Sequence, residues 1–241
     1  MILYKYFPCN EYTYQSLVLR GLWCHTYEYM NDPFECLAIL DREFKIKDLN
    51  IFRKIVSTSN ERRWKIVGSS EDDKLTNLLN DLRKKLISKY AFCSLSENPR
   101  DVLMWSHYAN SHKGIVVGFE FPELDANYHL IKVDYNDELR ELDLEKYAHY
   151  LINGNDNYLF DLFNDYSIKS TAWSDEKEWR IWRNKPCYYH FRPEQVKEVF
   201  FGLNTTLATK AIIYDLMSYS NDSIFHELEI KQNPLRLEVK K

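Results

Sequence analysis

Glycine is scarce in this chain, with only 6 among 241 residues. Glycine-rich loops let a backbone approach phosphate groups closely, as in the Gly-x-Gly-x-x-Gly and Gly-x-x-x-x-Gly-Lys-Ser/Thr motifs. Neither motif occurs in the sequence. A nucleotide would therefore have to be held by other means, and a dinucleotide-binding parallel sheet of the usual type is excluded.

Cysteine is also sparse. The 5 cysteines form an odd number, and no Cys-x-x-Cys pair is present. Secreted domains usually pair their cysteines in disulfides, whereas cytosolic proteins keep them reduced. We therefore expect reduced, mostly buried thiols in a cytoplasmic protein. No His-Glu-x-x-His motif or similar ligand spacing occurs, so no metal site is expected.

Positive charge is not in surplus, since 32 Lys and Arg residues face 36 Asp and Glu residues, for a net charge of −4. This balance argues against a general nucleic-acid binder, while it leaves room for a local basic patch. No apolar run approaches the length of a membrane span, and residues 1–5 do not begin a signal peptide. The sequence thus predicts no association with membranes.

Aromatic residues are abundant, with 18 Tyr, 13 Phe and 6 Trp, which predicts an aromatic-rich core and pocket. Short strand patterns are separated by helices of uneven length. They predict an α+β fold in a single domain over residues 1–241. Residues from about 41 to 89 are charged and helical in pattern, so we expect a helical insertion beside the core. Its leucines recur at helical spacing: Leu75, Leu78, Leu79, Leu82 and Leu86.

The segment 173–183 has the sequence Trp-Ser-Asp-Glu-Lys-Glu-Trp-Arg-Ile-Trp-Arg and favours a strand. At period two, Glu176, Glu178 and Arg180 share one face, with the two glutamates about 7 Å apart at the backbone. Repulsion between them should raise one pKa, and Arg180 should hold Glu178 ionised. An exposed edge strand is the simpler explanation for Glu-x-Glu alone. Three tryptophans instead suggest the wall of a pocket: Trp173, Trp179 and Trp182.

The segment 101–114 gathers further polar and aromatic residues before a buried strand. Asp101 can cap a helix that carries Trp105, His107 and Tyr108. His107 is a candidate general acid or base and Tyr108 a candidate stacking group. Each residue alone is more simply explained as part of the core edge, whereas the cluster favours a functional site. Ser94 follows a strand, but no Gly-x-Ser-x-Gly elbow surrounds it, so a hydrolase triad is poorly supported.

Five segments resemble a widespread bacterial family known as a domain of unknown function. They are Asn31-Asp32-Pro33-Phe34-Glu35, Phe92-Cys93-Ser94, Met104-Trp105-Ser106-His107-Tyr108-Ala109 with His112-Lys113-Gly114, Glu176-Lys177-Glu178-Trp179-Arg180, and Val199-Phe200-Phe201-Gly202. The resemblance spans nearly the whole chain. It implies no established activity.

A more distant resemblance connects the chain to the ADP-ribosyltransferase superfamily. Leu3-Tyr4-Lys5-Tyr6, the helix to Leu19, and Gly21-Leu22 are similar to the start of that core. Ser106, Tyr108 and the strand at residues 115–119 are similar to its middle motif, and Glu176-x-Glu178 to its last motif. This resemblance implies a split mixed or antiparallel sheet with helical insertions. Lys5 or Tyr6 replaces the His or Arg that the superfamily carries on its first strand.

The same resemblance implies an enzyme that uses NAD as a substrate to modify a macromolecule, either a protein or a nucleic acid. Glu178 would be the catalytic carboxylate, Glu176 would activate the acceptor, and His107 would assist. The cofactor-binding residues would be Lys5, Tyr6, Ser94, Trp105, Tyr108 and Arg180, with Tyr108 and Trp105 framing the nicotinamide. A toxin or phage-defence effector with a cognate inhibitor or defence partner fits this implication, and NAD hydrolysis is its simplest variant.

Two alternatives stay open at this point. The chain could be a nucleotide-sensing or protein-interaction module without catalysis. It could also be an RNase-type effector that uses His107, His112 and Lys113. If the chain is instead an NAD-consuming transferase, four side chains must converge on one pocket: Glu176, Glu178, Tyr108 and either Lys5 or Tyr6.

Overall fold

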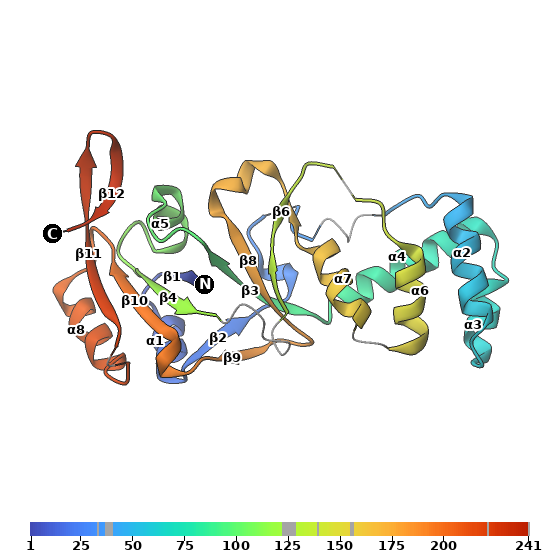
Figure 1. Ribbon diagram of the computed structural model, residues 1–241, viewed down its shortest axis with the longest axis horizontal. Coiled ribbons are helices and arrows are strands. Elements are labelled where there is room, and N and C mark those ends of the chain that lie inside the picture. The colour runs from blue at the N-terminus through green and yellow to red at the C-terminus, as the bar shows by residue number, and fades with distance from the viewer. Residues whose placement is uncertain are drawn as a thin grey trace.

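The chain is described from a computed structural model. The structure describes residues 1–32, 34–36, 41–121, 129–138, 140–154, 157–220 and 222–240. Figure 1 shows an elongated molecule in which strands occupy one end and a group of helices occupies the other.

The main sheet of the described residues has eight strands in the order β12-β11-β10-β4-β1-β3-β8-β5. β10 and β11 are parallel and the other described neighbours are antiparallel, so the sheet is mixed and the α+β prediction is confirmed. In chain order the strands are β1 (Ile2–Phe7), β3 (Ala91–Ser96), β4 (Ile115–Glu120), β5 (His129–Lys132), β8 (Glu178–Arg183), β10 (Val196–Phe201), β11 (Ile224–Gln232) and β12 (Leu235–Val239).

The sheet is almost divided between β1 and β3. β1 pairs with β4 along its whole length, from Ile2 opposite Glu120 to Phe7 opposite Ile115. Its register with β3 contains only the pair Tyr4 and Ser96. Two runs of strands therefore meet at one register pair and separate beyond it.

Helices cover both faces of the strand-rich end (Figure 1). α1 (Glu11–Val18) and α8 (Leu207–Leu216) pack Leu17 and Ile213 into the cluster that contains Leu3 and Val117. On the other face, α5 (Val102–Tyr108) packs Trp105 with Tyr6 and other residues. Because both faces are covered, β4 is buried along most of its length and reads as a continuous apolar run.

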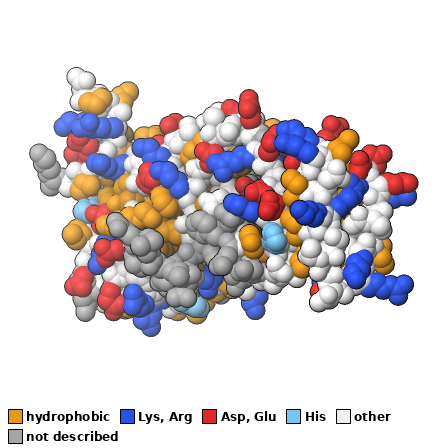
Figure 2. All heavy atoms as spheres, turned by 45° about the vertical axis from the view of Figure 1, so that its right-hand side comes forward, with side chains coloured by type: hydrophobic (Ala, Val, Ile, Leu, Met, Phe, Trp, Pro, Cys, Tyr) orange, Lys and Arg blue, Asp and Glu red, His pale blue; other side chains and the backbone are white. Residues whose placement is uncertain are grey.

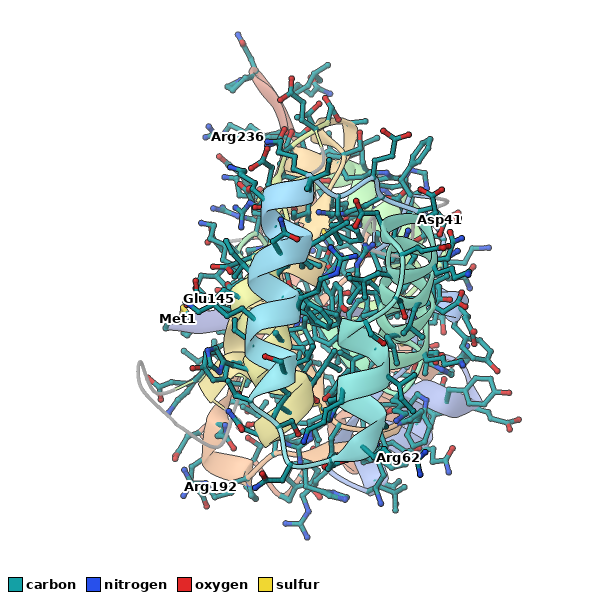
Figure 3. The ribbon with its side chains drawn as sticks, turned by 90° about the vertical axis from the view of Figure 1, so that its right-hand side faces the viewer. Met1, Asp41, Arg62, Glu145, Arg192 and Arg236 are labelled. Atoms are coloured by element: carbon teal, nitrogen blue, oxygen red, sulfur yellow. The ribbon has the colours of Figure 1, made fainter. Side chains whose placement is uncertain are left out.

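The helical pattern predicted for residues 41–89 is present, because these residues are all described and contain helices without a strand. They form α2 (Ile46–Ser57), α3 (Arg62–Gly68) and α4 (Asp72–Ile87). Figure 3 looks onto this end, with α2 in front and Arg62 at the start of α3. Figure 2 shows acidic and basic side chains interspersed over the helical part, as expected of a solvated surface.

The sequence pattern from Leu144 to Ser170 predicts a largely helical stretch with a loop at residues 154–157. α6 (Leu144–Asn153) and α7 (Asn157–Tyr166) fill most of this stretch. Its end is not helical, because Ile168–Lys169 form the short strand β7, which pairs in parallel with β6 (Asp134–Tyr135). A second small sheet pairs β2 (Gly21–Cys24) with β9 (Cys187–His190). The remaining 3-10 segments are η1 (Tyr27–Tyr29), η3 (Thr171–Glu176) and η4 (Pro193–Gln195).

The five cysteines are free thiols. Among the described residues, no group of three or more His, Cys, Asp and Glu side chains is placed to hold a metal ion. A search of the described helices found none with the length and hydropathy that a bilayer crossing needs.

Candidate functional site

A pocket of about 380 Å³ opens where β1 and β3 separate, a size at the lower end of small-ligand sites. The predicted convergence is confirmed, because Glu176, Glu178 and Tyr108 line it together with both Lys5 and Tyr6. The other lining residues are Tyr4, Tyr29, Met30, Asn31, Glu35, Ser94, Leu95, Met104, His107 and Lys169.

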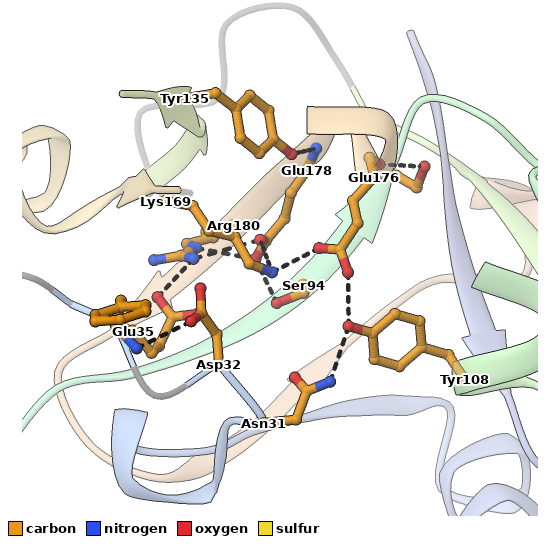
Figure 4. A network of polar contacts seen from close by, with 12 residues as sticks. Asn31, Asp32, Glu35, Ser94, Tyr108, Tyr135, Lys169, Glu176, Glu178 and Arg180 are labelled. Atoms are coloured by element: carbon orange, nitrogen blue, oxygen red, sulfur yellow. Dashed lines mark hydrogen bonds and ion pairs between the residues drawn. The ribbon is translucent and has the colours of Figure 1, made fainter. Parts of the chain in front are cut away.

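The glutamates reach the pocket from two different elements. Glu178 and Arg180 lie on the same face of β8, as strand periodicity predicted. Glu176 does not belong to that strand, because it ends η3, and Lys177 follows in the left-handed region at φ 44°. This turn brings the Glu176 carboxylate back toward Glu178, and Lys169 on β7 lies between the two (Figure 4).

Glu178 is surrounded by donors. Its Oε1 accepts from Ser94 Oγ at 2.6 Å and from Arg180 Nε at 2.9 Å. Its Oε2 accepts from Lys169 Nζ at 3.2 Å and from Arg180 Nη2 at 3.3 Å. The predicted pairing of Arg180 with Glu178 is therefore confirmed. The side chain is 3% exposed, so these donors replace the water that the carboxylate loses on burial.

Glu176 links the ion cluster to α5. Its Oε2 accepts from Lys169 Nζ at 2.6 Å, and its Oε1 accepts from the Tyr108 hydroxyl at 2.6 Å. Asn31 Nδ2 in turn donates to the Tyr108 oxygen at 3.1 Å. The Asn-Asp-Pro segment and the His-Tyr segment thus meet at one hydroxyl, although 77 positions separate them.

Glu35 belongs to the cluster through Arg180. Its Oε1 lies 2.7 Å from Arg180 Nη2, and the guanidinium also lies over the Phe92 ring at 4.4 Å. The Asn-Asp-Pro sequence is a turn signal, and Asp32 accepts from the Phe34 backbone at 2.9 Å, as expected of a turn. Pro33 lies outside the described residues.

The cluster holds three carboxylates and two cations, all buried: Glu35, Glu176, Glu178, Lys169 and Arg180. Burial alone would raise the pKa of Glu178, but Arg180 and Lys169 lower it to about 2. Arg180 therefore holds Glu178 ionised, as the shared strand face predicted. Burial does raise the pKa of Glu35, and Arg180 offsets that effect only in part.

Lys169 and Tyr108 keep their protons at neutral pH. Burial opposes the charge on Lys169, but Glu178 and Glu176 more than compensate and raise its pKa. Burial and the neighbouring Glu176 raise the pKa of Tyr108. Lys169 therefore stays a cation at neutral pH, and Tyr108 stays a hydrogen-bond donor.

Several predicted residues lie elsewhere or act differently. Trp105 is fully buried behind the pocket, where its Nε1 donates to Pro99 and its ring packs edge-on against Tyr6 at 5.6 Å. It is therefore not placed to frame a ligand. Lys5 and Tyr6 line the pocket. Lys5 Nζ donates to the Ser94 carbonyl on β3, and the Tyr6 hydroxyl donates to the Asn98 carbonyl after β3.

The predicted tryptophan wall is also wrong. Trp182 belongs to the helical core and stacks on Phe163, while Trp179 donates to Glu97 on the surface. Trp173 lies near the cluster through Lys169, whose Nζ is 4.9 Å from its ring centre. The described pocket is lined by tyrosines instead.

The two histidines proposed for RNA cleavage are not together. His107 lines the pocket. His112 stacks on Trp105 at 6.1 Å and interacts with Ser106, and it is not among the residues that line the pocket. This geometry gives no support for a mechanism in which both histidines act on one phosphate.

Lys169 is the residue that sequence reasoning missed. It lies in a two-residue strand at the end of a predicted helix, so no periodicity marked it. The remaining signal was a lysine seven positions before Glu176, in a segment otherwise poor in basic residues. That signal is weak without the pairing of β7 and β6.

Residues 104–181 match a family described as a protein of unknown function (DUF2971). The matched segment includes two of the five motifs, Tyr108, and four of the five cluster residues, Lys169, Glu176, Glu178 and Arg180. Comparisons with curated proteins and with solved structures gave no match. Over that segment, the resemblance to a domain family of unknown function is confirmed.

Proposed function

We propose that the chain is an enzyme of the ADP-ribosyltransferase type that consumes NAD. One observation carries the proposal: the pocket between β1 and β3 gathers Glu176, Glu178, Tyr108 and Tyr6 from three segments that are far apart in the chain. A split sheet with a glutamate at the start of a late strand is the arrangement that the distant resemblance implies.

The chemistry requires negative charge beside a developing cation. When the bond between ribose C1′ and the nicotinamide nitrogen breaks, the electron pair leaves with nicotinamide and the ribose becomes oxocarbenium-like. The pocket lining can supply the compensating charge, because three carboxylates face two cations in the cluster. A preorganised charge of this kind is among the largest single contributions to catalysis.

The acceptor step assigns different roles to the two glutamates. Glu178 is held by four donors and would stabilise the cation without moving. Glu176 is 7% exposed, against 3% for Glu178, and accepts from Tyr108 at the pocket surface. It would take the proton from the acceptor nucleophile as the new bond to C1′ forms. Tyr4, Tyr6 and Tyr29 offer ring faces for the nicotinamide or the adenine.

The test measures nicotinamide release and acceptor labelling on the purified chain. Glu178→Gln should lower nicotinamide release about 100-fold, because an electrostatic contact worth ~3 kcal/mol is lost from the transition state. Glu176→Gln should lose transfer while slow hydrolysis of NAD persists. The control is Glu229→Gln on exposed β11, which should match the parent. Absence of nicotinamide release from the parent, with water or a macromolecule as acceptor, would end the proposal.

One observation favours a second candidate, a ligand-binding module. Both oxygens of Glu178 are engaged by protein donors, as in a structural ion cluster that shapes a binding site. Calorimetry with NAD and with ADP-ribose separates the two candidates. Saturable binding without turnover selects the module, whereas turnover selects the enzyme.

A further inference from the structure

Five aromatic side chains form a row across the β2–β9 sheet and end at the pocket. Their order is His190, Tyr188, Trp23, His25 and Tyr29, and successive ring centres lie 6.0, 4.9, 5.7 and 4.4 Å apart. We call this set the aromatic row. Tyr29 at its end also lines the pocket.

The row lies on the outward face of the small sheet. Trp23 pairs opposite Tyr188, and Gly21 pairs opposite His190, so these positions share one face. Leu22 and Tyr189 point inward and are 1% exposed. By contrast, Trp23 is 39% exposed and Tyr29 is 71% exposed, so much of the aromatic surface is open to solvent.

A glycine makes the row continuous. A Cβ at position 21 would lie 2.9 Å from Cδ1 of Tyr188, which is too close for any real side chain. The absence of a side chain at Gly21 thus lets the Tyr188 ring lie across β2 between His190 and Trp23. A glycine here weakens the strand, because it has no side chain to pack.

The two segments that carry the row hold more positive than negative charge, in contrast to the whole chain. Residues 20–29 and 183–193 contain four cations, Arg20, Arg183, Lys185 and Arg192, against one acidic residue, Glu28. Lys5 lies close enough to His25 to lower its pKa, after the larger effect of burial.

We propose that the aromatic row is a docking surface for single-stranded nucleic acid. Unpaired bases stack on exposed aromatic rings, and flanking Lys and Arg neutralise the phosphates. A duplex hides its base faces, so it cannot use the rings in this way. The row leads to Tyr29 and the pocket, so the bound strand would be the macromolecular acceptor. That last role rests on the proposed function, whereas binding does not.

The experiment measures fluorescence anisotropy of labelled oligonucleotides of about 10 nucleotides, a length within the usual site sizes. Single-stranded RNA and DNA should each be tested against a duplex and against an abasic strand with the same phosphates. Binding of the single strands should exceed that of the duplex and of the abasic strand about 10-fold. The comparison of RNA with DNA identifies the natural source through the 2′-hydroxyl.

Variants locate the binding to the row. Trp23→Ala and Tyr188→Ala should each weaken binding about 10-fold, the loss expected for one stacked base, while Trp23→Phe should retain most of the affinity. Tyr12→Ala removes a ring on α1 that is more exposed than Trp23, 71% against 39%, and should change nothing. Replacing Arg183 and Lys185 together by Gln should flatten the salt dependence of binding. The same change at Arg62 and Lys65 on α3 should not.

The outcomes separate this proposal from the enzymatic one. Oligonucleotide binding is measured without NAD, and NAD hydrolysis is measured without oligonucleotide. Equal affinity of Trp23→Ala and Tyr12→Ala, equal binding of the abasic strand, or no binding at all would overturn the docking surface. Melting curves of the variants show whether a loss of affinity comes from unfolding.

Discussion

Buried charge decides much of the behaviour of single residues in this pocket. A carboxylate taken out of water stays ionised only where donors and cations replace the lost solvent. Glu178 has four such contacts, whereas Glu35 has one cation and keeps a raised pKa. The pKa values of the two carboxylates are thus shifted in opposite directions, although both contact Arg180.

The stability of the protein should fall in acid through Glu178. Its pKa is lowered from 4.5 to about 2, so the unfolded chain binds this proton more readily. The stabilisation is therefore present above pH 4.5 and is lost as the pH falls to about 2. Glu35 has a raised pKa and acts with the opposite sign, at higher pH.

Urea unfolding at a series of pH values measures this effect. The free energy of unfolding should fall between pH 4.5 and 2, with a contribution from Glu178 of the order of ~3 kcal/mol. Glu178→Gln should show a shallower pH dependence, while Glu229→Gln should follow the parent. Parallel curves for Glu178→Gln and the parent would contradict the assigned pKa.

The positions of the cluster residues could be predicted from the sequence only where the two-residue alternation of a strand determines which way a side chain points. Period two placed Glu178 and Arg180 on one face of a strand, because a strand alternates whatever surrounds it. The position of Glu176 depends on the left-handed turn at Lys177, and no local pattern marks a lysine there. Lys169 depends on pairing between two very short strands, a long-range property.

At the scale of elements, α5 holds the Tyr108 side of the pocket. Asp101 Oδ1 accepts from the Met104 backbone at 2.9 Å and so caps the helix, as the sequence predicted. The helix has only seven residues, so one cap is a large part of its stabilisation. Its position fixes the bond between Tyr108 and Glu176.

Two helix caps allow a matched comparison. Asp101→Ala and Asp143→Ala each remove a side-chain cap, at α5 and at α6, and should each lower the free energy of unfolding by about 1 kcal/mol. Only Asp101→Ala should also weaken ligand binding at the pocket, because only α5 carries Tyr108. Equal binding by both variants, measured by calorimetry, would show that α5 does not position the site.

Elements with a strong local signal were predicted well. β1, α1, β4 and β10 have clear apolar patterns with a Pro, Asn or Gly at a boundary, and the structure has each of them. β9 was missed because Cys-Tyr-Tyr-His is short and becomes a strand through pairing with β2. The split of the main sheet came from the family resemblance and not from any pattern of residues.

At the scale of the molecule, one aromatic cluster joins the helical end to the sheet. Trp182 on β8 stacks on Phe163 of α7 at 4.8 Å and contacts Phe92 of β3 at 4.7 Å. The same buried cluster contains residues of α2 and α4, such as Phe52 and Leu79. The helices therefore share their core with the strands.

A shared core should make unfolding cooperative, and this tests the prediction of a single domain over residues 1–241. Far-ultraviolet circular dichroism, which is dominated by helices, and tryptophan fluorescence should give coincident urea transitions. Trp182→Ala should lower the free energy of unfolding by about 3–5 kcal/mol and shift both transitions together. Two separate transitions in the parent would assign the helices to an independent unit.

The single register pair between β1 and β3 makes the width of the pocket adjustable. Beyond Tyr4 and Ser96, Lys5 Nζ spans the gap to Ser94 at 3.0 Å and the Tyr6 hydroxyl reaches the Asn98 carbonyl at 2.6 Å. Each such bond is worth about 1 kcal/mol net. We expect a ligand wider than the pocket to spread the strands by breaking these two side-chain bonds, while the backbone ladders on either side stay intact. Selectivity against bulky ligands should then depend on two replaceable side chains, Lys5 and Tyr6, more than on the rigidity of the sheet.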